Sequence, residues 1–203
     1  MKQIISIEHT DIDGLLLVQP QVFFDPRGYF FESYNQQRWN EAGISTDFVQ
    51  DNESQSKKGV LRGLHLQVQH PQTKLIRVAL GRIFDVAVDI RRGSKTFGKW
   101  FGTELSGDNK RQLFIPEGFA HGFLTLSDIA IICYKVSDYY HPEDERCIIW
   151  NDETIGVKWP DVQEGARTAV GVTNATLFDG TPILVSEKDS LGESWLNYVG
   201  SLN

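Results

Sequence analysis

Short runs of β-branched, leucine and aromatic residues, separated by turns rich in glycine or proline, constrain the fold of this chain most strongly. We expect strands at residues 15–20, 21–24, 29–34, 75–80, 83–90, 98–105, 112–115, 122–126, 130–136 and 147–150. The best helix candidate, 35–42, is short, with Asn35 placed to cap it and Gly43 to end it. Many short strands with only a few short helices favour an all-β sandwich or jelly roll over an α/β sheet.

The run 83–90 alternates strictly, which is the pattern of a strand with two different faces. Phe84, Val86, Val88 and Ile90 fall on one face, and Asp85, Ala87 and Asp89 fall on the other. Because carboxylates are rarely buried without a partner, we expect the two aspartates to be solvated or salt-bridged. The alternative places Asp85 inside a cavity, where it balances Lys74 or an arginine.

Composition narrows the class of protein. The chain has 203 residues, 40% of them hydrophobic, which suits one domain with a real core. A net charge of −7 argues against a protein whose whole surface binds nucleic acid or an anionic membrane. No apolar run approaches the roughly 18 to 20 residues that span a bilayer, and the N-terminus does not resemble a secretion signal. We therefore expect a cytoplasmic protein without nucleic-acid or membrane partners.

Cys133 and Cys147 should be reduced, and they have no metal-ligand spacing.

The segment 58–67 carries ionisable side chains into an otherwise apolar strand. It places Arg62 and His65 in a leucine-rich run flanked by glycines, after an expected polar loop at 48–54 and a turn at 56–59. Histidine holds or releases a proton near neutral pH, so His65 is a candidate base, although a lone strand histidine is more often a satisfied core residue. Strict alternation points Arg62 away from His65. The two side chains can therefore reach the same cavity only if the strand has a bulge near Gly63, or if Arg62 lies at the end of the strand, at the cavity mouth.

The segment 115–123 contains the pattern Pro-x-Gly-x-x-His, which resembles the second motif of cupin jelly rolls. Metal-binding cupins carry His-x-His in their first motif, whereas this chain has His65-Leu66-Gln67. Replacing an imidazole by a weak amide ligand leaves too few donors for tight transition-metal binding. We therefore predict a cupin-type cavity without a metal, in which His65 and His121 are available for hydrogen bonding and proton transfer.

Ten blocks within residues 4–160 resemble the dTDP-4-dehydrorhamnose 3,5-epimerase family in order and spacing. They are Val22-Phe23, Asp25-x-Arg27-Gly28, Phe31-Glu32-Ser33-Tyr34, Gln50-Asp51-Asn52, Leu61-Arg62-Gly63-Leu64-His65, residues 84–89, Ser94-x-Thr96-Phe97-Gly98, residues 116–123, Tyr134-Lys135 and Trp150-Asn151-Asp152. The resemblance implies epimerisation at carbons 3 and 5 of dTDP-4-dehydro-6-deoxy-D-glucose, in dTDP-L-rhamnose biosynthesis, by a homodimer that needs no cofactor. Removing a proton beside the ketone gives an enolate, and returning it to the opposite face inverts the carbon.

The resemblance also implies roles for individual residues. It makes His65 the base, Tyr134 the acid across the sugar ring, and Lys74 the group near the oxyanion. It makes Asp189, in the stretch 186–189, the carboxylate that holds the histidine, with Asp85 as the reserve candidate. Substrate contacts are implied for Phe23, Arg27, Glu32, Gln50, Asn52, Arg62, His121, Glu145 and Lys188. The arginines and lysines among them suit a diphosphate.

Two further expectations concern the ends of the chain. Phe23, Arg27 and Glu32 lie in an N-terminal arm that, in the family, reaches the partner's cavity, so dimerisation would complete the site. Residues 161–203 should form a C-terminal extension of a single 1–203 domain, packing on the core, and 161–183 exceed what the family usually has there. One alternative is an enzyme that inverts a single carbon of another dTDP-deoxysugar. The other is a metal-dependent or sugar-binding cupin.

Overall fold

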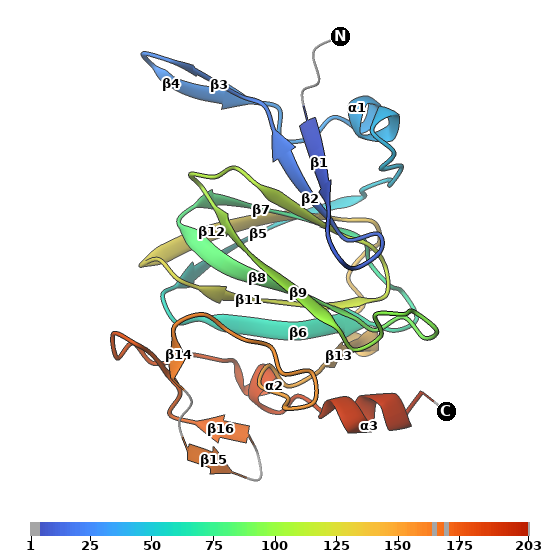
Figure 1. The fold of residues 1–203 in the computed structure, drawn as a ribbon, viewed down its shortest axis with the longest axis vertical. Helices are drawn as coiled ribbons and strands as arrows, with labels where there is room; N and C mark the ends of the chain where they lie inside the picture. The colour runs from blue at the N-terminus through green and yellow to red at the C-terminus, as the bar shows by residue number, and fades with distance from the viewer. Residues whose placement is uncertain (1–4, 164–165, 169–170, 203) are drawn as a thin grey trace.

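Two antiparallel sheets packed face to face form the body of the molecule in a computed structural model that describes residues 5–163, 166–168 and 171–202 (Figure 1). Among these residues, the six-stranded sheet has the order β1 (Ile5–His9), β2 (Leu16–Pro20), β10 (Gln112–Ile115), β7 (Lys74–Leu80), β12 (Ile129–Val136), β5 (Gln50–Lys57). The five-stranded sheet has the order β13 (Glu145–Cys147), β6 (Leu61–Gln67), β11 (Phe119–Thr125), β8 (Arg82–Asp89), β9 (Trp100–Ser106). The predicted all-β sandwich is confirmed.

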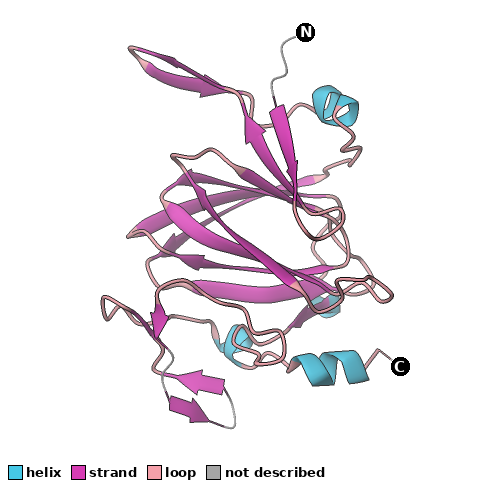
Figure 2. Cartoon of the chain, viewed as in Figure 1, coloured by secondary structure: helices cyan, strands magenta, loops and turns pink. Residues whose placement is uncertain are grey.

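Helices are short, as expected (Figure 2). In the described part of the chain they are α1 (Gln36–Glu41), the 3₁₀ turn η1 (Pro142–Asp144), α2 (Glu187–Ser190) and α3 (Trp195–Gly200). The Asn35 side chain accepts a hydrogen bond from the backbone N–H of Arg38 at 3.2 Å, so the predicted cap of α1 is confirmed. No helix of the described residues is long and apolar enough to cross a membrane.

The segment expected to be a polar loop at 48–54 is mostly a strand, so that prediction is wrong. Strand β5 pairs with β12 over its whole length and lies at the edge of its sheet. From residue 50 to residue 55 its side chains alternate between half-buried and exposed. A polar edge strand pairs its backbone on one side and presents charge to solvent, so hydrophobic alternation does not reveal it.

Strand β8 separates two apolar cores, as its alternation predicts. Ile83 and Ala87 are buried between the two sheets, whereas Val86 and Val88 are buried on the outer face of the five-stranded sheet. That outer face is covered by the C-terminal segment, where α2 and α3 lie beneath β6 and Trp195 joins the cluster (Figure 1). Burying a large apolar side chain contributes roughly 1.5–3 kcal/mol. The C-terminal segment is therefore held on the sandwich by apolar packing.

The described residues of the extension include two small strand pairs. Strand β14 (Val162–Gln163) pairs with β17 (Thr176–Leu177), and β15 (Ala166–Thr168) pairs with β16 (Gly171–Thr173). Ala175 and Leu177 are buried in the apolar cluster on the outer face of the five-stranded sheet. Leu184 and Val60 form an isolated parallel β-bridge. Residues 1–4, 164–165, 169–170 and 203 lie outside the described residues. The single-domain organisation of 1–203 stays an interpretation.

Asp89, at the end of β8, is a structural carboxylate. Arg91 donates to its two oxygens at 2.9 and 2.8 Å, and the hydroxyls of Ser94 and Thr96 donate at 2.6 and 2.7 Å. Burial raises the pKa of Asp89, but the hydrogen bonds from Arg91, Ser94 and Thr96 outweigh it and lower the pKa to about 2. The expected salt bridge is confirmed for this aspartate.

Candidate active site

A cavity of about 350 Å³ between the two sheets collects most of the predicted site residues. Its walls come from β5, β7 and β12 on one side and from β6, β11 and β13 on the other. The predicted residues that line it are Gln50, Asn52, Arg62, His65, Lys74, His121, Tyr134, Glu145 and Lys188. The fold thus brings together ionisable groups from segments that are far apart in the sequence.

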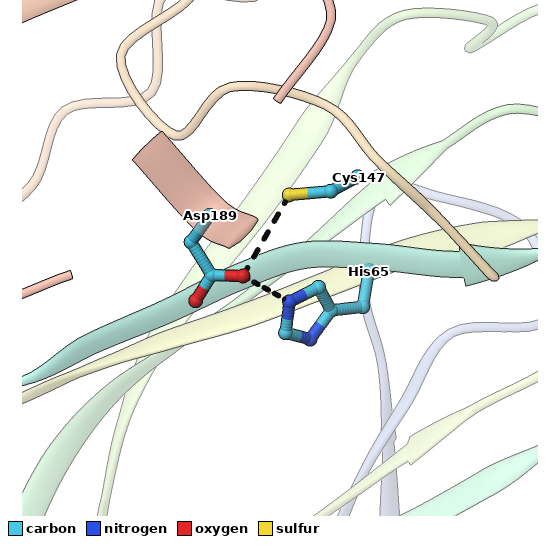
Figure 3. A group of neighbouring side chains, drawn as sticks. All are labelled: His65, Cys147 and Asp189. Atoms are coloured by element: carbon cyan, nitrogen blue, oxygen red, sulfur yellow. Dashed lines mark hydrogen bonds and ion pairs between the residues drawn. The ribbon is translucent and has the colours of Figure 1, made fainter. Parts of the chain in front are cut away.

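His65, in β6, is hydrogen-bonded to Asp189 of α2 (Figure 3). The distance from Nε2 to Oδ1 is 2.5 Å, although 124 residues separate the two. Asp189 lies behind the histidine, because its side chain is buried and it does not line the cavity. The other ring nitrogen, Nδ1, lies 3.9 Å from Glu145 Oε1 and has no hydrogen bond to the carboxylate of Asp189. It is the nitrogen left to accept a proton.

Local structure fixes the carboxylate of Asp189 in its ionised form. The Ser186 hydroxyl caps α2 and accepts from the Asp189 backbone N–H at 3.1 Å, while the Gly63 N–H lies 3.4 Å from Oδ2. Burial raises the pKa of Asp189, but the hydrogen bond and charge of His65, with the bonds from Gly63 and Ser186, lower it below its ordinary value. An anionic Asp189 offsets the charge of a protonated imidazole.

A bulge in β6 lets Arg62 and His65 line the same cavity. Across the strand pair, His65 faces His121 and Arg62 faces Phe123, so three steps along β6 match two along β11. Gly63 has a φ of +117°, and a Cβ there would lie 2.5 Å from the backbone of β11. Glycine therefore suits this position best. Of the two expected arrangements, the bulge near Gly63 is therefore the one that the structure shows.

Asp85 is fully buried and contacts His121, so of the two expected states, solvated or salt-bridged, the structure shows the paired one, with an imidazole as the partner. Both of its oxygens lie 3.0 Å from His121 Nε2. Asp85 sits on the inner face of β8 beside its neighbour β11, where the burial of a carboxylate is compensated by the imidazole. The reserve candidate for the partner of His65 is therefore engaged with the other cavity histidine.

Lys74 and Tyr134 line the cavity from the six-stranded sheet, opposite the wall that carries His65. Burial lowers the pKa of Lys74 to about 8, against the charges of Glu145 and Asp85, which raise it. Burial also raises the pKa of Tyr134. At neutral pH the cavity therefore presents an ammonium group and a protonated phenol to whatever it binds.

Glu145 connects three groups at the cavity wall. It accepts hydrogen bonds from the Tyr140 hydroxyl at 2.5 Å and from the Lys188 ammonium. Burial raises the pKa of Glu145, but the hydrogen bonds of Lys188 and Tyr140 and the charge of His65 lower it. Tyr140 also lines the cavity but is not among the predicted residues, because a loop tyrosine belongs to no periodic pattern. Its nearness in sequence to Glu145, five residues later, is the one feature of the sequence that could have suggested its place in the site.

Cys147 is a second neighbour of the site that is not among the predicted site residues. It lies opposite His65 in the pairing of β13 with β6, and its Sγ is 3.9 Å from Asp189 Oδ1 (Figure 3). Burial, with the negative charge of Asp189, raises the pKa of Cys147 to about 12. Both Cys147 and Cys133 are free thiols, as expected. Spacing along the sequence could not reveal that Cys147 shares a cluster with His65 and Asp189.

The remaining predicted residues belong to the β3 (Val22–Asp25) and β4 (Gly28–Phe31) hairpin, which projects from the body of the molecule, and to the segment after it (Figure 1). Arg27 pairs with Asp25 at 2.6 Å, and Glu32 pairs with Arg38 at 2.9 Å. Phe23 is 45% exposed. None of Phe23, Arg27 and Glu32 lines the cavity of its own chain.

Comparison with known proteins supports one family. A family model described as dTDP-4-dehydrorhamnose 3,5-epimerase matches residues 9–196. The epimerase of that name from Salmonella typhimurium is 59% identical over 153 residues, covering 74% of this chain and 84% of that protein. The one from Pseudomonas aeruginosa is 57% identical over 150 residues, covering 73% and 83%.

Solved structures agree with the sequence comparisons. The crystal structure of dTDP-6-deoxy-D-glucose-3,5-epimerase from Legionella pneumophila, in complex with dTDP-4-keto-L-rhamnose, is 45% identical with a TM-score of 0.84. The match covers 98% of this chain and 96% of that one, and so includes the C-terminal extension. The likeness confirms the expected cupin-type jelly roll. The chain belongs to the dTDP-4-dehydrorhamnose 3,5-epimerase family.

Proposed function

We propose that this chain converts dTDP-4-dehydro-6-deoxy-D-glucose to dTDP-4-dehydro-L-rhamnose by inverting carbons 3 and 5, as part of dTDP-L-rhamnose biosynthesis. The observation that carries the proposal is His65 on one wall of the cavity, hydrogen-bonded to Asp189 behind it, and Tyr134 on the other wall. Epimerisation needs a proton carrier on each face of the sugar, and the two sheets supply one each.

The reaction begins at the nitrogen of His65 that faces the cavity. Nδ1 takes the proton from the carbon next to the ketone, while Asp189 holds Nε2–H and stabilises the imidazolium that forms. The electron pair of the broken C–H bond moves onto the ketone oxygen, and the ammonium of Lys74 stabilises that enolate. Tyr134 then donates its proton to the opposite face of the carbon. No step requires a metal or an organic cofactor.

The nucleotide is held by local positive charge in an acidic protein. Arg62, Lys74 and Lys188 line the cavity, and Gln50 and Asn52 add amide groups from β5. Arginine and lysine bind diphosphate oxygens through charge-assisted hydrogen bonds. We assign the diphosphate to Arg62 and Lys188, and the sugar, with Lys74 at its ketone oxygen, to the part of the cavity between His65 and Tyr134.

Dimerisation completes the site in this proposal. The β3–β4 hairpin exposes Phe24 and Phe30 to 77% and 69%, which is costly for an isolated chain. In a homodimer the hairpin would carry Phe23, Arg27 and Glu32 to the cavity of the partner subunit. We also assign the enzyme to the cytoplasm, where dTDP-sugars are available, and treat 1–203 as one domain.

Product analysis in heavy water tests the proposal. The purified full-length chain is incubated with dTDP-4-dehydro-6-deoxy-D-glucose in D₂O, and the products are identified by NMR. We expect deuterium at carbons 3 and 5 and the L-rhamno configuration. His9→Asn is the control, because His9 is an exposed histidine at the sheet edge.

The outcome also separates the alternatives. Incorporation at one carbon alone would identify a single-carbon epimerase of another dTDP-deoxysugar. Binding of the nucleotide sugar without any exchange would identify a sugar-binding protein. Activity that disappears with a chelator and returns with a metal would identify a metal-dependent enzyme, and each of these results contradicts the proposal.

A further inference from the structure

We propose that His65, Cys147 and Asp189 form a binding site for a thiophilic divalent cation such as Zn²⁺, and that occupancy of this site inhibits the enzyme. Among the residues that the structure describes, these three donors have ligand atoms within 4.8 Å of one another (Figure 3). Imidazole nitrogen, cysteine sulfur and carboxylate oxygen are the ligand types that zinc takes in proteins. The inhibitory half of the proposal rests on the proposed function, whereas the binding half does not.

The three donors are held in place by separate elements. His65 and Cys147 face each other across the β6–β13 pair, so the sheet fixes their spacing. Asp189 is fixed by the Ser186 cap of α2 and by the contact of Oδ2 with the Gly63 N–H. A cation would not have to collect mobile side chains. The ordering cost of binding is correspondingly low.

The distances suit a tetrahedral ion after small movements. Zinc–ligand bonds of about 2.0–2.3 Å place neighbouring ligand atoms roughly 3.3–3.6 Å apart. In the structure, His65 Nε2 and Asp189 Oδ1 are 2.5 Å apart, and Cys147 Sγ and Asp189 Oδ1 are 3.9 Å apart. The first pair has to open and the second has to close, each by less than about 1 Å. The ligand atoms of His65 and Cys147, which lie within 4.8 Å of each other, have to approach to about 3.6 Å.

A second cavity gives an entry path from outside the substrate cavity. It has a volume of about 420 Å³ and borders His65 and Asp189 from the side of the extension, where Leu184 and Ser186 line it. A water molecule in this cavity can take the fourth position on the ion. Mg²⁺ is disfavoured, because it requires near-octahedral oxygen ligands and keeps its own waters.

Binding removes the base without blocking the substrate cavity. The imidazole first changes tautomer, because its Nε2 proton passes to solvent and Nδ1 takes up a proton from solvent. The cation then takes the free lone pair of His65 Nε2, replaces the hydrogen bond to Asp189, and bonds to Cys147 sulfur as the S–H proton passes to solvent. A neutral imidazole with a metal on Nε2 carries its proton on Nδ1. Nδ1 then has no lone pair for the substrate proton. No electron is transferred in any of these steps.

Cobalt binding to the chelator-treated full chain tests the site without substrate. We expect Co²⁺ to give a cobalt–thiolate charge-transfer band in the near ultraviolet, at one cobalt per chain. Cys147→Ser should lose the band. Cys133→Ser is the matched control, because Cys133 lies on β12 in the other sheet, and it should keep the band. A wild-type protein without this band, or a band that survives in Cys147→Ser, would overturn the proposal.

Zinc titration of epimerase activity tests the inhibition, with each variant compared with its own zinc-free rate. We expect zinc to reduce the wild-type rate more than tenfold, EDTA to restore it, and Cys147→Ser or Cys147→Ala to need at least about tenfold more zinc. Thermal unfolding checks that both variants are folded. Equal zinc sensitivity of the wild type and the folded variants contradicts the proposal. An inactive chain that still shows the cobalt band contradicts the proposed function and leaves the cation site intact.

Discussion

The two histidine–aspartate pairs of this molecule are assembled in different ways. His121 and Asp85 come from β11 and β8, which are neighbouring strands, so sheet pairing alone brings them together. His65 and Asp189 meet only because the C-terminal segment returns to the outer face of the sandwich and places α2 behind β6. The first pair belongs to the sandwich itself, and the second depends on the docking of the extension.

The pairs also differ in their access to the cavity. The His65 side chain is 29% exposed, whereas that of His121 is 11% exposed. A base has to reach the substrate proton, and the more open imidazole is better placed to do so. We therefore assign proton abstraction to His65 and substrate positioning to His121. The predictions below test this difference, from the largest expected effect to the smallest.

Replacing the proposed base has the largest effect. His65→Asn should lower deuterium exchange at both carbons by about 10³- to 10⁴-fold, because general-base catalysis is removed together with the charge partner of Asp189. His121→Asn should act mainly on KM. Steady-state kinetics and NMR exchange measure both. Comparable losses of kcat in the two variants would remove the distinction between the pairs.

Removing an anchor of the extension tests whether the second pair depends on docking. Trp195 is 7% exposed and packs against Phe97 and Tyr198, with ring centroids 5.0 and 5.7 Å away. Trp195→Ala should lower the free energy of unfolding by about 3–5 kcal/mol. Chemical denaturation measures this change. A loss below about 1 kcal/mol would mean that the extension contributes little to holding Asp189 in place.

Replacing the acid separates abstraction from inversion. Tyr134→Phe removes the proton that the six-stranded sheet supplies but leaves His65 and Asp189 in place, so exchange should continue while completed inversion falls by about 10²-fold. NMR in D₂O distinguishes labelled substrate from inverted product. An unchanged yield of inverted product would exclude the phenol as the proton donor.

The ionisation of Lys74 predicts a change in rate with pH. Because burial lowers the pKa of Lys74 to about 8, the ammonium is lost as pH rises through that value, and kcat should fall by about tenfold above it. Lys74→Arg should move this limb to higher pH, since arginine stays charged. A pH–rate profile of the two proteins provides the measurement. An identical alkaline limb in both would assign the limb to another group.

The same shift has a consequence for stability. Between about pH 8 and the ordinary value of 10.5, the unfolded chain binds more protons at Lys74 than the folded chain. The free energy of unfolding should therefore rise with pH over this window, as far as this group is concerned. Below pH 8 both states are protonated, and the cost of burying the charge is present in full.

Residue patterns predict the sandwich better than they predict the site. The alternation of 83–90 correctly separates the two cores. The alternation that points Arg62 away from His65 leaves two arrangements open, and the bulge near Gly63 is the one that the structure shows. Strand β5 escapes this reasoning, because an edge strand buries too little apolar surface to alternate visibly.

The site is harder to predict because tertiary contacts assemble it. Asp189 and His65 are joined across 124 residues, so no local pattern pairs them, and only the family resemblance suggests the contact. The Asp85 carboxylate is buried and paired with His121; the rule that charged residues are rarely buried without a partner predicts a pairing but does not identify the partner. Cys147 enters the cluster through its register with β6, and register between distant strands is not visible in the sequence.

Paired substitutions of the two carboxylates test the central claim most directly. The measurement is the rate of deuterium exchange at carbons 3 and 5 of the keto sugar for Asp189→Asn and for Asp85→Asn. The account predicts a loss of about 10²- to 10⁴-fold for Asp189→Asn, because the amide no longer stabilises the imidazolium of His65, and a loss within about tenfold for Asp85→Asn. The reverse order, or equal losses, would contradict it.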